Sequence, residues 1–195
     1  GGEAATLAVT PESGSWEPGD TGVEVRSTRG TTTLNGRAAF VQDARKAGFF
    51  VISARGPGGV GLYAVAADAP GVTLTPDRIV DLTRDQATLA LDGVAVDAPP
   101  VVAPEGRGVG ALESALPATL WVLAANLCGA AQWQLQTTAE YARTRVQFEH
   151  PIGFFQAVKH PIVNMMIAVD RARSLTYAAA CAVDHEPDDA LRLAR

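Results

Sequence analysis

The chain has 195 residues, of which 47% are hydrophobic, and its 16 Lys and Arg against 21 Asp and Glu leave a formal net charge of -5. This composition is ordinary for a folded globular chain, and its acidic balance argues against a general surface for nucleic acid or an anionic membrane, so any anion site must be built locally. The sequence has no uninterrupted run of eighteen apolar residues and no basic segment leading into an apolar one, so it predicts neither a transmembrane helix nor a signal peptide.

Residues 7–96 are a series of short apolar or alternating runs separated by Gly, Pro, Asn and Asp, a pattern typical of β-strands. The runs are LAVT, VEVRS, TTTL, RAAFV, FFVISA, GLYAVAA, VTLT and ATLALDGVAV. With about eight strands and no helix between them, a compact antiparallel barrel or sandwich is the expected closure.

Three glycine-containing segments in this region match known turn or loop motifs. Asn35-Gly36 and Asp92-Gly93 each lie between two apolar runs and favour two-residue hairpin turns, because both residues of such turns tolerate positive φ. Residues 56–61, GPGGVG, match the G-x-G-x-x-G dinucleotide fingerprint, but a strand follows where that fingerprint requires a helix. The sequence therefore predicts a hairpin loop at 56–61.

After the Pro- and Gly-rich connection 97–110, the apolar period becomes helical. One long helix is predicted from about 110 to 145, and a second from about 154–156 to 183, with Pro161 kinking its start. Its apolar face would contain Val158, Ile162, Met165, Met166, Val169, Ala172 and Tyr177. Residues 184–189 read as the beginning of a third helix.

Strands first and helices afterwards predict the α+β class. We expect a β-domain at residues 1–104, followed by long antiparallel helices of an incomplete helical bundle at 105–195. The chain begins without Met and stops inside an apparent helix, so it reads as a piece of a longer protein. Cys128 and Cys181 lie in apolar stretches without CxxC spacing, which favours a reducing, cytoplasmic compartment.

Residues 105–114, EGRGVGALES, form a Gly-rich turn that enters a helix and could present backbone N–H groups to a phosphate, although a plain linker is the more common use of such a turn. The three histidines lack ligand spacing, and no serine lies in a G-x-S-x-G elbow, so neither a metal site nor a hydrolase triad is predicted.

The break between the two long helices, YARTRVQFEHPIGFFQAVKH at 141–160, is the best candidate site. Arg143 and Arg145 are two residues apart and cannot share one helix face, and Arg145 lies nearer the break. Arg145, Phe148 and Gln156 would supply a guanidinium for a diphosphate, an aromatic ring for an adenine and an amide for polar contacts. Ordinary packing between the helices is the alternative interpretation.

The same segment, together with NMMIAVDRARSLTYAAA further along, resembles the C-terminal helices of the acyl-CoA dehydrogenase family, flavin enzymes that desaturate acyl-CoA thioesters. The hairpin LNGRAAFVQDARKAGFFVISAR at 34–55 and the strands LALDGVAVDAP at 89–99 resemble the middle β-domain of that family. The resemblance covers nearly the whole chain and implies the middle domain plus about half of a C-terminal four-helix bundle.

The resemblance also implies a bound FAD. Arg145, Phe148 and Gln156 would contact the diphosphate and adenine end of an FAD held by a neighbouring subunit. Phe40 and Gln42 stand where the family has Trp and Thr, against the flavin ring and near its reactive nitrogen. Thr10 and Ser15 are the counterparts in the shortened loop VTPESGSW at 9–16, which also lacks the family's Asp, and Glu149 replaces a usual Gly.

The implied reaction is α,β-desaturation, in which a carboxylate removes the α-proton while the β-hydride passes to the flavin. In most members the base is a Glu beyond Arg195; in a minority it stands near Thr119, which cannot serve, and Glu113 lies on another helical face. No catalytic residue is therefore assigned within the chain, and we expect the chain alone to be inactive.

Expected partners are an acyl-CoA, an electron-transfer flavoprotein or similar acceptor, and further subunits of a dimer or homotetramer. Two other readings remain: a non-catalytic subunit that completes a partner's FAD site, and a binding module without flavin.

Overall fold

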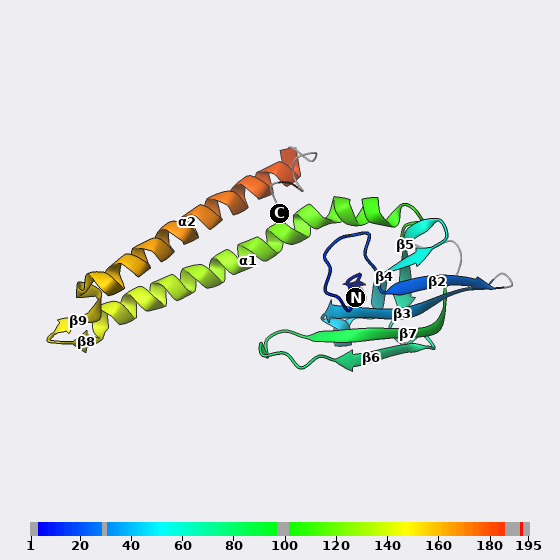
Figure 1. The fold of residues 1–195 in the computed structure, drawn as a ribbon, viewed down its shortest axis with the longest axis horizontal. Coiled ribbons are helices and arrows are strands. Elements are labelled where there is room, and N and C mark those ends of the chain that lie inside the picture. The colour runs from blue at the N-terminus through cyan, green and yellow to red at the C-terminus, as the bar shows by residue number, and fades with distance from the viewer. Residues whose placement is uncertain (1–3, 29–30, 97–101, 186–191, 193–195) are drawn as a thin grey trace. The chain divides into compact units, whose positions relative to one another are not determined.

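A computed structural model describes residues 4–28, 31–96, 102–185 and 192 of the chain. Contacts divide the chain into two compact units, residues 1–113 and 114–195. Strands come first and two long helices follow (Figure 1), which confirms the predicted α+β class. The predicted domain boundary after residue 104 stays a prediction.

Seven strands of the first unit belong to one sheet with the order β1-β4-β2-β3-β7-β6, and β5 pairs with β4. Among the described residues no ladder joins β6 to β1 or β5, so the expected barrel closure is not seen. The strands are β1 (Ala5–Ala8), β2 (Val23–Thr28), β3 (Thr31–Gln42), β4 (Phe49–Gly56), β5 (Gly59–Ala66), β6 (Val72–Pro76) and β7 (Gln86–Val96); η1 (Ala44–Lys46) is a short 3-10 helix.

The sheet is mixed, whereas the sequence predicted an antiparallel one. Strand β4 pairs in parallel with β1 over four residues and with β2 at one position, whereas the other ladders are antiparallel. Parallel partners need a long crossover, and alternation of apolar residues carries no information about strand direction. The hairpin predicted at 56–61 is confirmed, because β4 and β5 pair up to Gly56 and Gly59.

The dipeptides 35–36 and 92–93, predicted as hairpin turns, lie instead inside the continuous strands β3 and β7. They meet across the ladder as a β-bulge, where Asn35 alone faces Asp92 and Gly93. Gly93 has a φ of 62°, and its N–H donates to Asn35 Oδ1 at 2.9 Å. A bulge and a tight hairpin turn both need a residue that tolerates positive φ, so the dipeptides alone could not distinguish the two.

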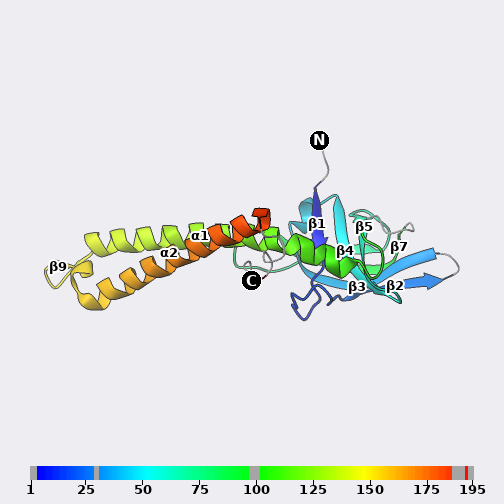
Figure 2. The same cartoon turned by 90° about the horizontal axis from the view of Figure 1, so that it is seen from above.

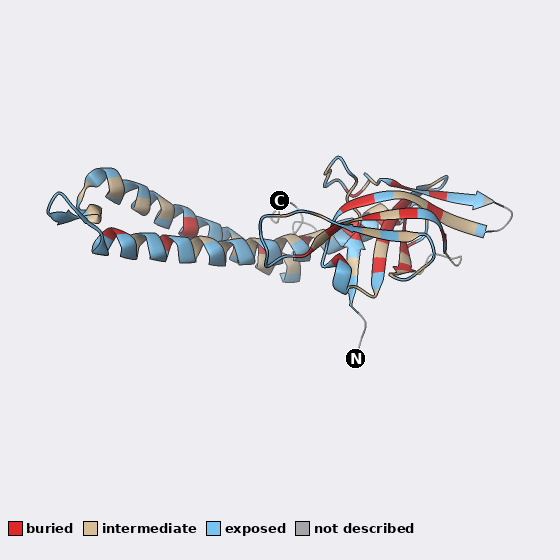
Figure 3. Cartoon of the chain, turned by 90° about the horizontal axis from the view of Figure 1, so that it is seen from below, coloured by how far each residue is buried: buried red, intermediate tan, exposed pale blue. Residues whose placement is uncertain are grey.

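Most buried side chains of the β unit form one large apolar cluster, and Figure 3 shows buried positions along its strands. A smaller buried cluster consists of Leu62, Ala103 and Leu112. Along β7, buried residues alternate with partly buried ones up to Leu91, and burial resumes at Val94 after the bulge inserts one extra residue. The largest fully buried side chains are Phe50, Leu34, Ile52, Leu89, Val23, Val41 and Val94. Each contributes about 1.5–3 kcal/mol by leaving water, so this cluster dominates the stability of the unit.

Asp85, immediately before β7, ties that strand to η1. Its side chain is only 6% exposed, and its two oxygens accept from Arg45 Nε at 2.6 Å and from the Arg45 backbone N–H at 3.2 Å. Burial raises the pKa of the Asp85 carboxyl, but hydrogen bonds from Arg45 and the charges of Arg45 and Lys46 outweigh burial and hold that pKa below its ordinary value. The carboxylate is therefore the form that the folded unit favours.

We expect Asp85→Asn to lower the thermal midpoint at pH 7, with a loss that shrinks as the pH falls below 4. The folded pKa is lowered, so the stabilisation is present above the unfolded pKa of about 3.9 and disappears as the pH falls through the folded value. Thermal unfolding followed by circular dichroism measures this, with Asp43→Asn as control because the Asp43–Lys46 pair is exposed. An equal loss at pH 7 and pH 3 would contradict the prediction.

The two long helices of the second part of the chain are α1 (Gly108–Thr144) and α2 (Gln156–His185). They run side by side in opposite directions (Figure 2), with Cys128 Sγ 3.3 Å from Thr176 Oγ1 and Arg173 bonded to Gln132. Both predicted helices are confirmed, and Pro161 lies inside α2. The third helix predicted from 184–189 falls outside the described residues, apart from the last residues of α2.

The face of α2 that packs on α1 is narrower than predicted. Val169 is buried and three other predicted residues are partly buried, but Met166, Ala172 and Tyr177 are exposed. A pair of helices covers one stripe on each partner, whereas a bundle helix carries a wider apolar surface. The large apolar residues left exposed beyond residue 114 include Val122, Leu127, Trp133, Tyr141, Ile167 and Leu175.

Among the described residues, α1 alone is long and apolar enough to cross a membrane, with a mean hydropathy of 1.4 over its best eighteen-residue window. This test uses length and composition only, and helices from the core of a bundle also pass it. It is weak evidence, and we assign no membrane span from it.

Candidate functional site

Phe40 is turned outward by a second bulge in β3. Ala39 and Phe40 together face Thr88 alone on β7, and Phe40 has a φ of 57°. Positive φ is costly for a bulky residue and persists only where the surrounding structure imposes it. The side chain of Phe40 is 48% exposed, so the bulge presents an aromatic face at the edge of the β unit.

The loop before β2 lies beside this ring. The Ala39 N–H donates to the Thr10 carbonyl at 2.8 Å, and a Cβ added to Gly14 would lie 3.7 Å from Phe40 Cε2. The Thr10 hydroxyl has no hydrogen-bond partner among the described residues, whereas the Ser15 hydroxyl donates to Asp20 at 2.5 Å. The structure thus places Thr10 beside Phe40. The Ser15 hydroxyl, in contrast, donates its hydrogen bond within its own loop.

Gln42 lies two residues beyond Phe40, and its exposed side chain is held in one orientation by two hydrogen bonds. Its amide nitrogen donates to the Phe40 carbonyl at 3.3 Å and to Gln86 Oε1 at 2.9 Å. An aromatic face, an oriented amide and an unpartnered hydroxyl on one edge suit a planar heteroaromatic ring with polar atoms along its rim. These residues therefore fit a flavin ring.

The break between α1 and α2 is a very short β-hairpin. Strands β8 (Val146–Gln147) and β9 (His150–Pro151) pair, and the 3-10 helix η2 (Ile152–Phe154) leads into α2. Its two central residues, Phe148 and Glu149, have φ of 52° and 65°, as a two-residue type I′ turn requires, although Asn and Gly are the residues that usually occupy it. The strained turn leaves the Phe148 side chain 84% exposed.

Replacing Glu149 with glycine is expected to stabilise the helical unit by about 0.5–1 kcal/mol, because glycine adopts positive φ without strain. Urea unfolding of the intact protein measures the change. The matched control is Glu140→Gly in the last turns of α1, where glycine should instead destabilise by about 1 kcal/mol. A loss of stability in Glu149→Gly would show that the Glu149 side chain contributes more than the strain costs.

Aromatic rings and an unpaired arginine surround this turn. Phe155 lies edge-on to Phe148 at 6.0 Å between ring centroids, and His150 stacks on Phe154 at 4.5 Å. Arg145 follows the end of α1 and has no side-chain partner among the described residues, whereas Arg143 pairs with Glu140 at 3.3 Å. Of the two arginines, Arg143 is thus the one held by an ion pair among the described residues.

Gln156 is the first residue of α2 and is exposed. The first turn of α2 holds no acidic residue, so the partial positive charge of its N-terminus is not offset there. Arg145, Phe148 and Gln156 all belong to the short reversal between the helices, and their groups suit an anion joined to an aromatic base. Their predicted roles in cofactor binding stay predictions.

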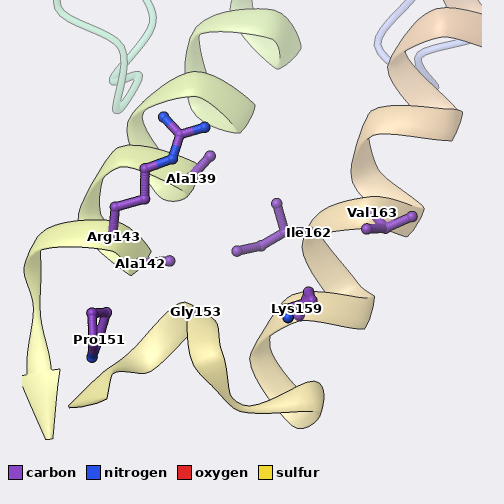
Figure 4. Close-up of a pocket in the computed structure, with 8 residues that line it drawn as sticks. All are labelled: Ala139, Ala142, Arg143, Pro151, Gly153, Lys159, Ile162 and Val163. Atoms are coloured by element: carbon purple, nitrogen blue, oxygen red, sulfur yellow. The ribbon is translucent and has the colours of Figure 1, made fainter. Parts of the chain in front are cut away.

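A groove of about 310 Å³ lies between the last turns of α1 and the first turns of α2 (Figure 4). In Figure 4, Ile162 points from α2 toward α1 across the groove. Its lining is mainly apolar, with two cationic side chains, and consists of Ala139, Ala142, Arg143, Pro151, Gly153, Lys159, Ile162 and Val163.

Other candidates from the sequence are weaker in the structure. In the Gly-rich turn, the N–H groups of Gly106 and Arg107 donate to Val60 and Pro104, so both are taken and the linker interpretation is favoured. The Thr119 hydroxyl donates to the Ala115 carbonyl within its own helix. No group of three or more metal-ligating side chains occurs in the part of the chain that the structure describes.

Together these features define a protein with a mixed β unit and a long antiparallel helix pair, each presenting an exposed aromatic beside polar groups. The model of the acyl-CoA dehydrogenase C-terminal domain matches residues 106–194. The chain is 36% identical over 167 residues to acyl-CoA dehydrogenase FadE27 of Mycobacterium tuberculosis. This aligned region covers 84% of this chain and 43% of that protein.

Solved structures agree. The chain superposes on the ChsE4-ChsE5 complex from Mycobacterium tuberculosis with a TM-score of 0.81 and 30% identity, over 98% of this chain and 50% of that one. A glutaryl-CoA dehydrogenase from Mycobacterium smegmatis in complex with FADH2 gives a TM-score of 0.83 at 23% identity, over 94% and 48% of the two chains, and this similarity supports the fold alone. The chain belongs to the acyl-CoA dehydrogenase family. It spans about half the length of the curated relatives it matches.

Proposed function

We propose that the intact protein is an FAD-dependent acyl-CoA dehydrogenase, to which this chain contributes two cofactor-binding edges. The first edge, on the β unit, consists of Thr10, Phe40 and Gln42. The second edge, between α1 and α2, consists of Arg145, Phe148 and Gln156. The observation that carries the proposal is the hairpin between α1 and α2, whose strained turn exposes Phe148 close in sequence to the unpaired Arg145. Strain held at an exposed aromatic is typical of a binding site rather than of packing.

Each edge would do a different part of the binding. Arg145 would hold the diphosphate, Phe148 would cover the adenine and Gln156 would give polar contacts, all to an FAD in a neighbouring subunit. On the β unit, Phe40 would lie against the flavin ring, with Gln42 and Thr10 at its rim and Ser15 only as a structural member of the loop. Bound FAD supplies the two-electron oxidation of the acyl group. A dimer or tetramer is part of the proposal, because Arg145, Phe148 and Gln156 would contact an FAD held by a neighbouring subunit.

The acid–base part of the reaction is not assigned to these residues. A carboxylate must remove the α-proton of the thioester, and the hydroxyl of Thr119 cannot act as that base. An acyl-CoA as substrate, an electron-transfer flavoprotein or similar acceptor and a cytoplasmic location are further parts of the proposal. They rest on the family and on Cys128 and Cys181, which are both free cysteines.

A second function has one observation in its favour. The ChsE4-ChsE5 neighbour, at 30% identity, is named as a complex of two different proteins. The chain would then be a non-catalytic subunit whose Arg145, Phe148 and Gln156 complete a partner's FAD site. The changes at Phe40, Gln42 and Glu149 from the family pattern suit a subunit released from part of the catalytic task.

The test is the absorption spectrum of the intact protein from about 300 to 550 nm, before and after a panel of acyl-CoA thioesters. A flavin band that bleaches with a thioester supports the dehydrogenase and identifies the acyl class. A band that never bleaches, or one that appears only with a second protein, supports the non-catalytic subunit. No flavin band in any preparation would overturn both and leave a binding module.

A further inference from the structure

A series of hydrogen bonds leads from Gln42 at the end of β3, through Gln86 on β7, to Asp77 just after β6. Gln42 Nε2 donates to Gln86 Oε1 at 2.9 Å, and Gln86 Nε2 donates to Asp77 Oδ2 at 3.0 Å. The other oxygen of Asp77 accepts from the Thr88 hydroxyl at 3.0 Å, and the Asp77 backbone N–H donates to the Gln86 carbonyl at 2.9 Å. Asp77 and Gln86 are partly buried at the two ends of the connection between β6 and β7.

The chemistry of these three side chains determines which of them donates in each step of this hydrogen-bond relay. An ionised carboxylate only accepts hydrogen bonds, so the end of Gln86 that meets Asp77 must be the amide nitrogen. The Gln86 amide oxygen then faces Gln42, so Gln42 must donate to it from its own amide nitrogen. Amide orientation in proteins is assigned from such networks, and here the carboxylate determines both amides in turn.

Gln42 is left with only an acceptor to offer. Its two N–H groups are used by the Phe40 carbonyl and by Gln86, at 3.3 and 2.9 Å. What remains is the amide oxygen, on a side chain that is otherwise exposed. The threonine that the family has at this position carries a hydroxyl, which can either donate or accept.

We propose that Asp77 and Gln86 are positioning residues that hold the Gln42 amide with its oxygen toward the bound flavin, and that this arrangement favours the reduced ring. The inference rests on the proposed function. The reactive nitrogen of an oxidised flavin has only a lone pair, which an amide oxygen repels. In the reduced ring the same nitrogen carries a hydrogen, which the oxygen accepts. The relay therefore raises the reduction potential of the flavin.

The test is a redox titration of flavin-loaded intact protein against indicator dyes, with Asp77→Asn as the main variant. An asparagine at 77 can donate as well as accept, so the relay loses its direction and the Gln42 N–H becomes available to the oxidised ring. We expect the ratio of reduced to oxidised flavin at a given potential to fall about tenfold, which corresponds to about 30 mV for a two-electron couple.

The sign of the shift separates the relay from simple electrostatics. Removing a negative charge near a flavin favours its reduced form, so loss of the Asp77 charge alone would raise the potential. Gln86→Leu changes no charge and should lower the potential in the same direction as Asp77→Asn. Asp43→Asn, an exposed carboxylate bonded to Lys46, is the matched charge control and should leave the potential nearly unchanged.

A double-mutant cycle gives the sharpest result. With threonine at 42, the substitution Asp77→Asn should no longer lower the potential, because the relay has no amide to orient. An unchanged or raised potential in both Asp77→Asn and Gln86→Leu would overturn the relay while leaving the dehydrogenase intact. Absence of flavin from the wild-type protein would overturn the proposed function and this inference together.

Discussion

Replacing Arg145 with alanine is expected to weaken the binding of FAD to the intact oligomer by about tenfold to a hundredfold, the usual effect of losing a hydrogen bond to a charged group. Arg145 has no other partner among the described residues, so its guanidinium is available to a diphosphate at no cost to the fold. Flavin release, followed by fluorescence during dilution or dialysis, gives the dissociation constant directly.

The matched control is Arg143→Ala. Arg143 is two residues away, carries the same charge and already pairs with Glu140 on the surface of α1. Its removal should change flavin affinity by less than about threefold, since surface ion pairs contribute little and general attraction is screened by salt. Equal losses in the two variants would mean that only net charge matters, and the assignment of Arg145 to the diphosphate would then be wrong.

Phe50→Ala is expected to destabilise the β unit by about 3–5 kcal/mol, which is a large part of the stability of an ordinary domain. Phe50 is fully buried in β4, opposite Val65 on β5, and its ring belongs to the central cluster of the sheet. Removing the ring would leave a cavity among other buried residues of this cluster. Urea unfolding followed by circular dichroism measures the loss.

The neighbouring residue supplies the control for this variant. Phe49 is on the same strand and pairs with Ala66, but its side chain is 39% exposed on the other face. Phe49→Ala should cost clearly less, about 1 kcal/mol, because much of the ring already contacts water. If the two substitutions were equally costly, the core would extend through both faces of β4 and the burial pattern of the strand would be misread.

Two positions of backbone strain coincide with predicted cofactor contacts. Among the described residues, the non-glycine positions with positive φ are Phe40, Asp43, Phe148 and Glu149. Phe40 and Phe148 are the two exposed aromatics assigned to the flavin ring and to the adenine, one on each unit. Such strain costs of order 1–3 kcal/mol per residue and is retained where it positions a group for binding.

The sequence by itself determined the class of the fold and the place of the second edge. Helical periodicity predicted both long helices within a few residues of their observed ends, because apolar spacing and the helix-breaking residues near 145–155 act locally. The strand after residues 56–61 ruled out a dinucleotide fingerprint for the same local reason. Arg145, Phe148 and Gln156 could be predicted as one group because they lie within one short stretch of chain.

Only the tertiary structure decided what the glycine dipeptides of the β unit do and what holds Gln42. A residue with positive φ serves a turn or a bulge equally well, and pairing between β3 and β7 selects the bulge at Asn35 and Gly93. Strand direction likewise depends on crossovers rather than on alternation, which is why the parallel pairs of β4 were missed. Gln86 stands 44 residues from its partner Gln42, so their hydrogen bond exists only once the sheet has assembled.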